Sequence, residues 1–506
     1  MRARRVHGII RPMGQPIETA STESEAGSGR AARIGRFAGP AAAAALVAAT
    51  HPAWGAAGGL NADAAWILGL LAWMAIWWMT HAAELAVTSL LPVVLLPALG
   101  IMPFREVAGN YADQVIFLFA GGTTIAWALD RHGISERFVG ALLRTAGRSP
   151  STVIAALFVA AACVSAFVSN MAVTAMMLPL ALGVAATAVA APGASTDAAA
   201  RGRRNLTVAA LLAIAYGSSV GGGATLVGSP PNPIAAENLA KAGQPIDFLG
   251  WMKVGVPMSV AMTVVAIPIL WWMLPCGGVV LGGAARADGA SARPAWTPAA
   301  ILTLTVFALT VAAWTTGKHW PDWMRPRDLP DGGIAIAAAL ALMLMPALDG
   351  TNARVVPWRA ARELPWGVFI LFGGGLALAD AMQETGLSVA IGRHFEGLGS
   401  VAPVVALGMV AASLIFASEV GSNTALTATA VPILVAAAPA TGLPLKQLVL
   451  AATFGASYAF MLPVGTPPNA LVYATGRVPH GTMMRVGFVL NLAAIVVVTA
   501  VAWLLA

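Results

Sequence analysis

A polar pattern that interrupts long apolar segments occurs twice in this chain, 253 residues apart. The first copy is Ser165–Pro179, with the sequence SAFVSNMAVTAMMLP, and the second is Ser418–Pro432, with the sequence SEVGSNTALTATAVP. Hydroxyl and amide groups inside hydrocarbon have no water to bond, so they need protein partners or a ligand. A pattern of this kind, present once in each half of a chain, indicates one binding centre built from two halves.

The apolar background around this pattern defines the class of protein. Hydrophobic residues make up 58% of the 506 residues and charged residues 10%, whereas about a quarter of the residues of a soluble domain are charged. Apolar segments recur from about residue 64 to residue 506, and ~20 such residues suffice to cross ~30 Å of hydrocarbon. We therefore expect an all-α polytopic membrane protein with about eleven spans.

Basic residues gather before the first span. Residues 1–36 contain seven arginines and are rich in Gly, Ser and Thr, so we expect a disordered tail that the positive-inside rule places in the cytoplasm. No aromatic residue interleaves with these arginines before Phe37, and nucleic-acid binding is not expected. The alanine-rich composition, with no recognisable organelle signal, favours the inner membrane of a bacterium.

A second interruption also occurs in both halves. Residues 217–233 combine three consecutive glycines with three prolines, and we expect that they cannot stay helical. Their Gly-Ser-Pro-Pro-Asn run at 228–232 matches Gly-Thr-Pro-Pro-Asn at 465–469. Unwound backbone at membrane depth is tolerated only where it is buried or lines a cavity, so both runs are expected to belong to the binding centre.

These duplications divide the chain into repeats. The glycine-interrupted segments Val115–Asp130 and Phe369–Asp380 match at the same offset, and each suits one arm of a re-entrant hairpin. We expect leading helices and a first repeat over residues 37–274, a linker over 275–298, and a second repeat over 299–506. Interrupted segments in matching places point to a secondary transporter with inverted repeats and broken transmembrane helices.

The chemistry of each Ser-Asn tip suits two kinds of ligand. The N-terminus of the helix that follows favours a carboxylate or another oxyanion, and the carbonyl end of the preceding helix, with the Ser and Asn oxygens, favours a small hard cation. No Lys or Arg lies in either tip or in either Gly-x-Pro-Pro-Asn run. A bound anion would therefore depend on helix ends and bound cations, which is a physical reason for coupled transport.

Two further observations concern the acids and nucleophiles near the tips. Glu419 follows Ser418, and it is either a proton carrier or a structural partner of nearby hydroxyls or backbone; we favour the structural role. The serines have no nearby histidine or paired carboxylates, so we expect no catalytic residue and no membrane-embedded enzyme. A channel is also disfavoured, because matched broken helices favour alternating access.

At these residues the chain resembles the divalent anion/sodium symporter family over about residues 60–506. The doubled tip carries the resemblance together with Ala459–Gly476, AFMLPVGTPPNALVYATG. The resemblance implies a homodimer of eleven-helix protomers with two re-entrant hairpins and an elevator-type movement. It also implies sodium-coupled transport of C4-dicarboxylates such as succinate, malate or fumarate, and in some members of citrate or sulfate.

The resemblance also implies which residues bind. The two sodium sites would take oxygens from Ser165, Ser169, Asn170 and Gly228, and from Ser418, Ser422, Asn423 and Gly465. The substrate would lie between the tips, at the positions Asn170, Met171, Ser229, Pro230, Asn423, Thr424, Thr466 and Pro467.

This sequence departs from the family pattern at two of these positions. Met171 stands where the family has threonine, and Ser229 replaces the commoner threonine. The loss of a hydroxyl at residue 171 predicts an altered substrate preference or weaker binding of an ordinary dicarboxylate. Three alternatives stay open: a carrier of sulfate or another oxyanion, a proton-coupled carrier, and a cation-independent exchanger, which would be expected to carry fixed positive charge near the tips.

Overall fold

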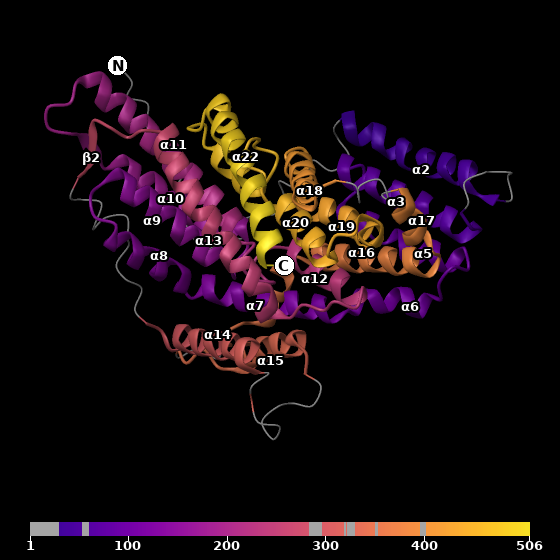
Figure 1. The fold of residues 1–506 in the computed structure, drawn as a ribbon. Coiled ribbons are helices and arrows are strands. Elements are labelled where there is room, and N and C mark those ends of the chain that lie inside the picture. Colours follow the sequence, from indigo (N-terminus) through magenta and orange to yellow (C-terminus); the bar gives the residue numbers. More distant parts are fainter. Residues whose placement is uncertain are drawn as a thin grey trace, which may run out of the picture.

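The protein is described by a computed structural model that covers residues 30–52, 60–282, 296–317, 320, 329–349, 353–394 and 401–505. About three quarters of these residues lie in helices, and the described strands are two short segments (Figure 1). The predicted fold class, an all-α polytopic membrane protein with two repeats and interrupted helices, is confirmed.

The first half of the chain holds the leading helices and the first polar tip. Its elements are α2 (Arg30–Thr50), α3 (Ala62–Thr80), α4 (Leu85–Thr88), α5 (Leu91–Ala98), α6 (Phe104–Gly109), η2 (Asn110–Ala112), α7 (Gln114–Arg131), α8 (Ile134–Thr145), α9 (Pro150–Ser165), α10 (Asn170–Ala186), β1 (Ala188–Ala190), α11 (Thr196–Gly221), α12 (Pro231–Lys241), α13 (Phe248–Met273) and β2 (Val279–Leu281).

The second half repeats the order of the first from α7 onward. Its elements are α14 (Pro298–Thr316), α15 (Asp331–Leu344), η5 (Trp358–Glu363), α16 (Trp366–Glu384), α17 (Leu387–His394), α18 (Pro403–Ser418), α19 (Asn423–Thr441), α20 (Leu445–Ser457), α21 (Pro467–Ala474) and α22 (His480–Leu505). The helices α9 and α18 have the same length, and both end at the serine that opens the polar pattern.

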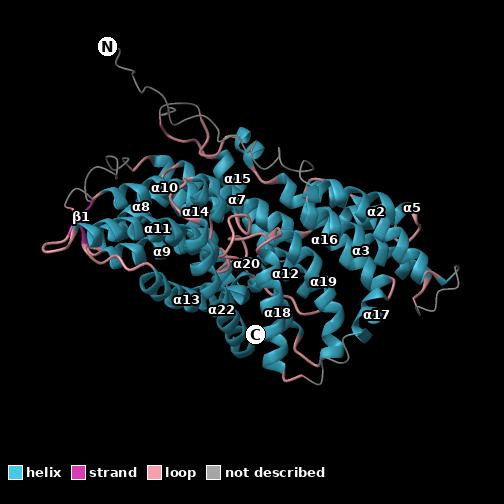
Figure 2. Cartoon of the chain, turned by 90° about the horizontal axis from the view of Figure 1, so that it is seen from above, coloured by secondary structure: helices cyan, strands magenta, loops and turns pink. Residues whose placement is uncertain are grey.

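The molecule is elongated. Seen from above, α8–α11 and β1 lie at one end, whereas α2, α3, α5 and α17 lie at the other (Figure 2). The helices α18–α20 lie between these ends, and α14 and α15 run along one side (Figure 1). The strands β1 and β2 form a small antiparallel pair in the register Ala188↔Leu281.

Seven described helical segments are long and apolar enough to cross a membrane, and five shorter apolar helices accompany them. The tips divide apolar stretches into shorter helices such as α9 and α10, of 16 and 17 residues.

Two expectations differ from the structure. Residues 30–36 belong to α2 rather than to a disordered tail, because this helix packs along α3; residues 1–29 lie outside the described residues. The sequence 275–298 contains β2, and the domain division stays a prediction.

The second difference concerns the break in the first half. The segment expected to be unwound begins at residue 217, yet α11 continues to Gly221. A Cβ atom on Gly221 would collide with the backbone of Ala162 on α9, so the glycine permits close helix packing rather than ending the helix. The prolines at the other end of the break lie in the first turn of α12, where a missing N–H donor has no cost.

A short helix of each repeat packs against helices of the other repeat. The helix α12 of the first repeat packs against α19 and α20 of the second, while α21 of the second packs against α10 and α11 of the first. A two-fold relation between repeats produces contacts of this reciprocal kind. This reciprocal packing brings the segment before α12, residues 222–230, next to the segment before α21, residues 458–466. We call these two stretches the first and second unwound segments.

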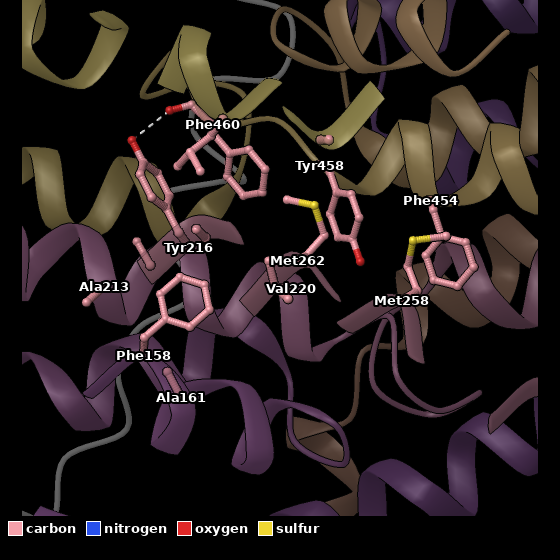
Figure 3. Packing of buried hydrophobic residues seen from close by; sticks show 14 of the residues in the cluster. Phe158, Ala161, Ala213, Tyr216, Val220, Met258, Met262, Phe454, Tyr458 and Phe460 are labelled. Atoms are coloured by element: carbon pink, nitrogen blue, oxygen red, sulfur yellow. Dashed lines mark hydrogen bonds between the residues drawn. The ribbon is translucent and has the colours of Figure 1, made fainter. Parts of the chain in front are cut away.

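The largest hydrophobic core lies at the junction of the repeats (Figure 3). Tyr216 of α11 points toward Phe460 of the second unwound segment, and its hydroxyl donates to the Phe460 carbonyl at 2.8 Å. Trp251 of α13 donates to the Gly223 carbonyl of the first unwound segment at 3.0 Å. The core therefore satisfies the polar backbone of both segments while it excludes water.

A partly buried ion pair also joins the halves. The Lys241 ammonium, at the end of α12, lies 2.6 Å from the Asp380 carboxylate on α16 and donates to Asn110 Oδ1 at 2.6 Å. The carboxyl groups of Glu237 and Asp113 belong to the same group of charges. Lys241 is the only cation of this group among the described residues, so the acids around it depend on its charge.

The variant Lys241→Met tests this link. Removing the ammonium leaves Asp380 without its cation, and the side chains of the pair are only 15% and 28% exposed. Because Asp380 keeps some solvent, we expect a loss of roughly 1–3 kcal/mol rather than the full cost of an unpaired buried charge. The unfolding midpoint of the purified protein in detergent should fall, whereas Lys253→Met, at an exposed lysine of α13, should not change it. Equal midpoints for the two variants would show that the Lys241–Asp380 pair does not stabilise the protein.

Candidate functional site

Both Ser-Asn tips are helix N-termini. The helices α10 and α19 begin at Asn170 and Asn423, and the preceding serines act as N-caps. Ala172 N–H donates to Ser169 Oγ at 3.3 Å, and Ala425 N–H donates to Ser422 Oγ at 3.4 Å. Because the cap occupies one donor of the first turn, the remaining N–H groups and the positive end of the helix dipole stay available to an anion.

Three carbonyl oxygens crowd around Gly228 in the first unwound segment. A Cβ atom placed on Gly228 would lie 2.6 Å from the Gly222 oxygen, 2.8 Å from the Ala166 oxygen and 2.9 Å from the Ser165 oxygen. Only glycine fits among these oxygens, which we call the carbonyl cluster. Each carbonyl oxygen has two lone pairs, so the cluster provides the kind of ligands that a small hard cation prefers.

The side chains of the first tip lie beside this cluster. Ser165 is fully buried, and its hydroxyl donates to Asn170 Oδ1 at 2.7 Å. A Cβ atom on Gly222 would meet the same Asn170 oxygen at 2.4 Å. The structure thus brings together Ser165, Asn170 and Gly228, three of the predicted residues. Ser169 is exposed, and its oxygen already serves as the N-cap.

The second tip has a different environment. The Asn423 amide, oriented to satisfy its neighbours, donates to the Ala456 and Gly465 carbonyl oxygens, both at 3.2 Å. A Cβ atom on Gly465 would lie 3.0 Å from Glu419 Oε2 rather than among carbonyl oxygens. Asn423 and Gly465 are therefore adjacent, as predicted, but the carboxylate of Glu419 occupies the side of Gly465 where the first half has carbonyl groups.

Glu419 holds the second unwound segment in place. Its Oε1 atom accepts from Phe460 N–H at 2.8 Å and from Met461 N–H at 2.9 Å, and its Oε2 atom accepts from Leu462 N–H at 2.8 Å. The Asn491 amide of α22 donates to the same carboxylate at 2.7 Å. Four donors thus converge on this carboxylate, and hydrogen bonds to a charged group are among the stronger ones in proteins. The favoured structural role of Glu419 thus agrees with its contacts.

A hydroxyl replaces this carboxylate in the first half. The counterpart of Glu419 is Ala166, whose carbonyl accepts a hydrogen bond from Thr225 Oγ1 in the first unwound segment. A neutral hydroxyl therefore ties the first tip to its segment, whereas a carboxylate ties the second. The two half-sites are alike in backbone path and different in charge.

Two buried asparagines belong to the site, although the sequence reasoning gave them no role. The Asn232 amide donates to the Gly222 oxygen at 2.8 Å and to the Thr225 oxygen at 2.7 Å. Asn469, its match in the second repeat, donates to the Ala459 oxygen at 3.0 Å and to the Leu462 oxygen at 3.2 Å. Each of these side chains is fully buried, and its Oδ1 atom has no hydrogen-bond partner among the described residues. Their place at the end of each Gly-x-Pro-Pro-Asn run was the signal in the sequence.

The remaining predicted substrate residues vary in exposure. Met171 is 41% exposed at the second position of α10, so its thioether faces open space beside the tip. Thr466 is buried, and its hydroxyl accepts from Asn469 N–H at 3.3 Å as the N-cap of α21. Ser229 is buried, whereas Pro467 is exposed and Thr424 and Pro230 are half-buried.

The two half-sites meet through their unwound segments. A Cβ atom on Gly223 would lie 2.9 Å from the Phe454 ring and 3.4 Å from the Tyr458 hydroxyl. The first unwound segment therefore touches the end of α20 and the start of the second segment. The described residues contain no group of three His, Cys, Asp or Glu side chains that could hold a metal ion. The oxygen groups of the tips are of the kind that a hard cation prefers.

Comparison with known proteins shows a family and named relatives that this chain matches. Residues 75–455 match the family described as "Citrate transporter". A protein of Staphylococcus saprophyticus named "Sodium-dependent dicarboxylate transporter SdcS" is 33% identical over 465 residues, which cover 88% of this chain and 87% of the relative. The protein of that name from Staphylococcus aureus strain NCTC 8325 is 32% identical over 454 residues, which cover 87% of this chain and 85% of the relative.

A solved structure has a similar arrangement of helices. It is the Alcanivorax borkumensis YdaH transporter, described as having an unusual topology, with a TM-score of 0.52 and 14% identity. The match covers 86% of this chain and 97% of that one. At this identity, the likeness concerns the fold alone.

The variant Glu419→Gln tests the role of the carboxylate. Glutamine has the same shape, but its NH₂ group would face backbone N–H donors and lose charge-assisted bonds, each worth roughly 1.5–3 kcal/mol. We expect a clearly lower unfolding midpoint. Glu106→Gln, at an exposed acid of α6, is the control and should leave the midpoint unchanged. A Glu419→Gln protein with the wild-type midpoint would show that the charge does not hold the segment.

Proposed function

Because this chain belongs to the divalent anion/sodium symporter family, we propose that it is a secondary transporter that moves a small divalent anion together with sodium. The chain is a multi-pass membrane transporter and not an enzyme. The proposed substrate class is the C4-dicarboxylates, such as succinate, malate or fumarate. The names of the relatives support this class and the sodium coupling.

The carbonyl cluster at Gly228 is the observation that carries the proposal. Sodium is a hard cation and takes oxygen ligands, and the cluster offers three backbone oxygens beside the side-chain oxygens of Ser165 and Asn170. A sodium ion there would lie next to the N-terminus of α10. The donor set therefore fits the first proposed sodium site, with Ser165, Asn170 and Gly228 as its residues and Ser169 at its edge.

The second proposed sodium site is formed by Ser418, Ser422, Asn423 and Gly465. The fully buried Ser418 Oγ donates to the Ile415 carbonyl at 3.3 Å, so its lone pairs remain for a cation. The fixed negative charge of Glu419 lies beside Gly465. That charge favours a cation at the second tip and disfavours an anion very close to Gly465, so sodium is required before the anion can bind there.

The anion is proposed to bind between the N-termini of α10 and α19. Neither tip and neither unwound segment contains Lys or Arg, so helix ends and the bound cations supply the positive field. One carboxylate of the substrate would approach Asn170 and Ser229, and the other would approach Asn423 and Thr424. Pro230, Thr466 and Pro467 would close the loops around the substrate.

Coupling follows from the position of the ions. An empty cation site leaves carbonyl oxygens facing one another, and this arrangement repels a carboxylate. Bound sodium reverses the local charge and orders the unwound segment, so the anion binds to the sodium-loaded form. The elevator-type movement, the homodimer, the bacterial inner membrane and the cytoplasmic N-terminus are part of the same proposal, and they rest on the family resemblance.

The rival carriers find less support. A proton carrier needs a buried acid whose oxygens are accessible, and both oxygens of Glu419 already accept hydrogen bonds from backbone N–H groups and from Asn491. A cation-independent exchanger needs fixed positive charge near the tips, which the sequence lacks there. A carrier of sulfate or another oxyanion remains the second candidate, because Met171 removes a hydroxyl from the substrate side of the first tip.

The first test of the proposal is uptake of radiolabelled succinate into proteoliposomes with and without an inward sodium gradient. We expect uptake that requires sodium and is lost in Asn423→Ala. The control is Asn238→Ala, a buried asparagine whose amide donates to the Ile234 carbonyl of its own helix. Uptake that ignores sodium but responds to internal succinate would instead identify an exchanger.

The second test restores the missing hydroxyl. In Met171→Thr, a new hydrogen bond to a substrate carboxylate is worth roughly 1.5–3 kcal/mol, so the succinate concentration at half-maximal uptake should fall by roughly ten- to a hundredfold. Sulfate inhibition should be measured in parallel, since a sulfate carrier would show stronger inhibition in the wild type. Unchanged succinate affinity would mean that residue 171 does not face the substrate.

A further inference from the structure

A cavity of about 540 Å³ lies outside the proposed transport site, at the C-terminal end of α10. Arg203 and Arg204 line it from α11 in the first repeat, and Arg477 lines it from the loop between α21 and α22 in the second. Apolar residues of α10, among them Leu182 and Ala186, line most of the remainder, together with Ala188 of β1 and Thr207 of α11. The cavity is thus cationic on one side and apolar on the other.

The positive charge of this cavity is uncompensated. No acidic residue lines it, and within the described part of the chain none of the three arginines forms an ion pair. All three arginines are exposed. Like charges that converge on one cavity repel one another, so an anion that enters it is stabilised.

Neighbouring residues place the cavity at the level of the lipid headgroups. The Asn205 amide, one residue after Arg204, donates to the Pro275 carbonyl at 2.9 Å. Pro275 follows the end of α13, a candidate membrane span, where Trp271 and Trp272 are 40% and 74% exposed. Exposed tryptophans at the end of a span mark the membrane–water interface. A cluster of arginines at that level is typical of the cytoplasmic leaflet, which carries the anionic lipids.

We propose that this cavity binds the phosphate group of an anionic lipid through Arg203, Arg204 and Arg477. Planar guanidinium groups bind phosphate oxygens in pairs, and basic pockets between membrane helices recognise lipid headgroups. The apolar side chains of α10 lie where the first part of an acyl chain would run. A free phosphate ion offers the same charge but leaves this apolar wall unused, so the lipid is the favoured source.

The position of Arg477 gives the site a further consequence, which rests on the proposed transport function. Arg477 follows α21, and α21 begins where the second unwound segment ends. A phosphate held by arginines of both repeats would fix α21 against α10 and α11, against which it packs. Lipid occupancy would then influence the second tip without any contact with the substrate.

The test measures lipid binding rather than transport, so its result does not depend on the proposed function. The full-length protein in detergent is incubated with phosphatidylglycerol or phosphatidylcholine, and retained lipid is counted by native mass spectrometry. The variant is Arg204→Gln with Arg477→Gln. The control is Arg201→Gln, an exposed arginine of the same helix that does not line the cavity. Far-ultraviolet circular dichroism and the unfolding midpoint confirm that each protein is folded.

We expect the wild type and the control to retain phosphatidylglycerol and not phosphatidylcholine. A juxtamembrane arginine contributes roughly a fivefold change in affinity for anionic lipid, so the double variant should bind roughly 25-fold more weakly. Inorganic phosphate is added as a competitor. If millimolar phosphate displaces the lipid only from proteins with the intact arginines, the site binds both the lipid phosphate group and free phosphate. If phosphate displaces no lipid, the site is specific for lipid. Equal retention by the double variant and the control would overturn the proposal.

Discussion

Backbone groups that leave a helix inside the membrane have no water to bond, and the whole centre of this transporter depends on how they are satisfied. Two asparagines and one glutamate perform most of this task. Asn232 and Asn469 each donate two bonds to carbonyl groups of their own unwound segment, while Glu419 accepts from three N–H groups of the second segment. Without these partners the unwound segments would leave backbone polar groups without hydrogen bonds inside the membrane, which is energetically costly.

Satisfying the backbone in this way also creates the chemistry of the site. In the first half, Thr225 donates to the Ala166 carbonyl and adds no charge to the tip, so the remaining lone pairs of the carbonyl cluster around Gly228 are available to a cation. In the second half, a carboxylate performs the corresponding task and adds a fixed negative charge near Gly465. The repeats therefore share a backbone path but give unequal electrostatic surroundings to the two proposed ion sites, and we expect these sites to differ in affinity.

The reciprocal packing of α12 and α21 connects this centre to the rest of the molecule. Lys241 fixes the far end of α12 to α16 through Asp380, and Arg477 follows the far end of α21 at the proposed lipid cavity. Each short helix thus begins at an unwound segment and ends at a group of charges. This symmetry of position suggests that both charged groups influence the tips through the helix that they hold.

The sequence by itself determined the class of protein, the two repeats and the places where helices end, because these depend on local properties: apolar length, N-cap serines, and prolines that cannot continue a helix. The helices that follow the two tips, α10 and α19, begin at Asn170 and Asn423, as the pattern predicts. It did not determine where α11 ends, because Gly221 is helical only through its packing on α9. Nor could it assign the partners of Glu419, since Asn491 lies 72 residues away in an apolar span. Only the tertiary structure decided these contacts and brought Arg204 and Arg477 to the same cavity. Both depend on how distant helices pack and not on any property of the local chain.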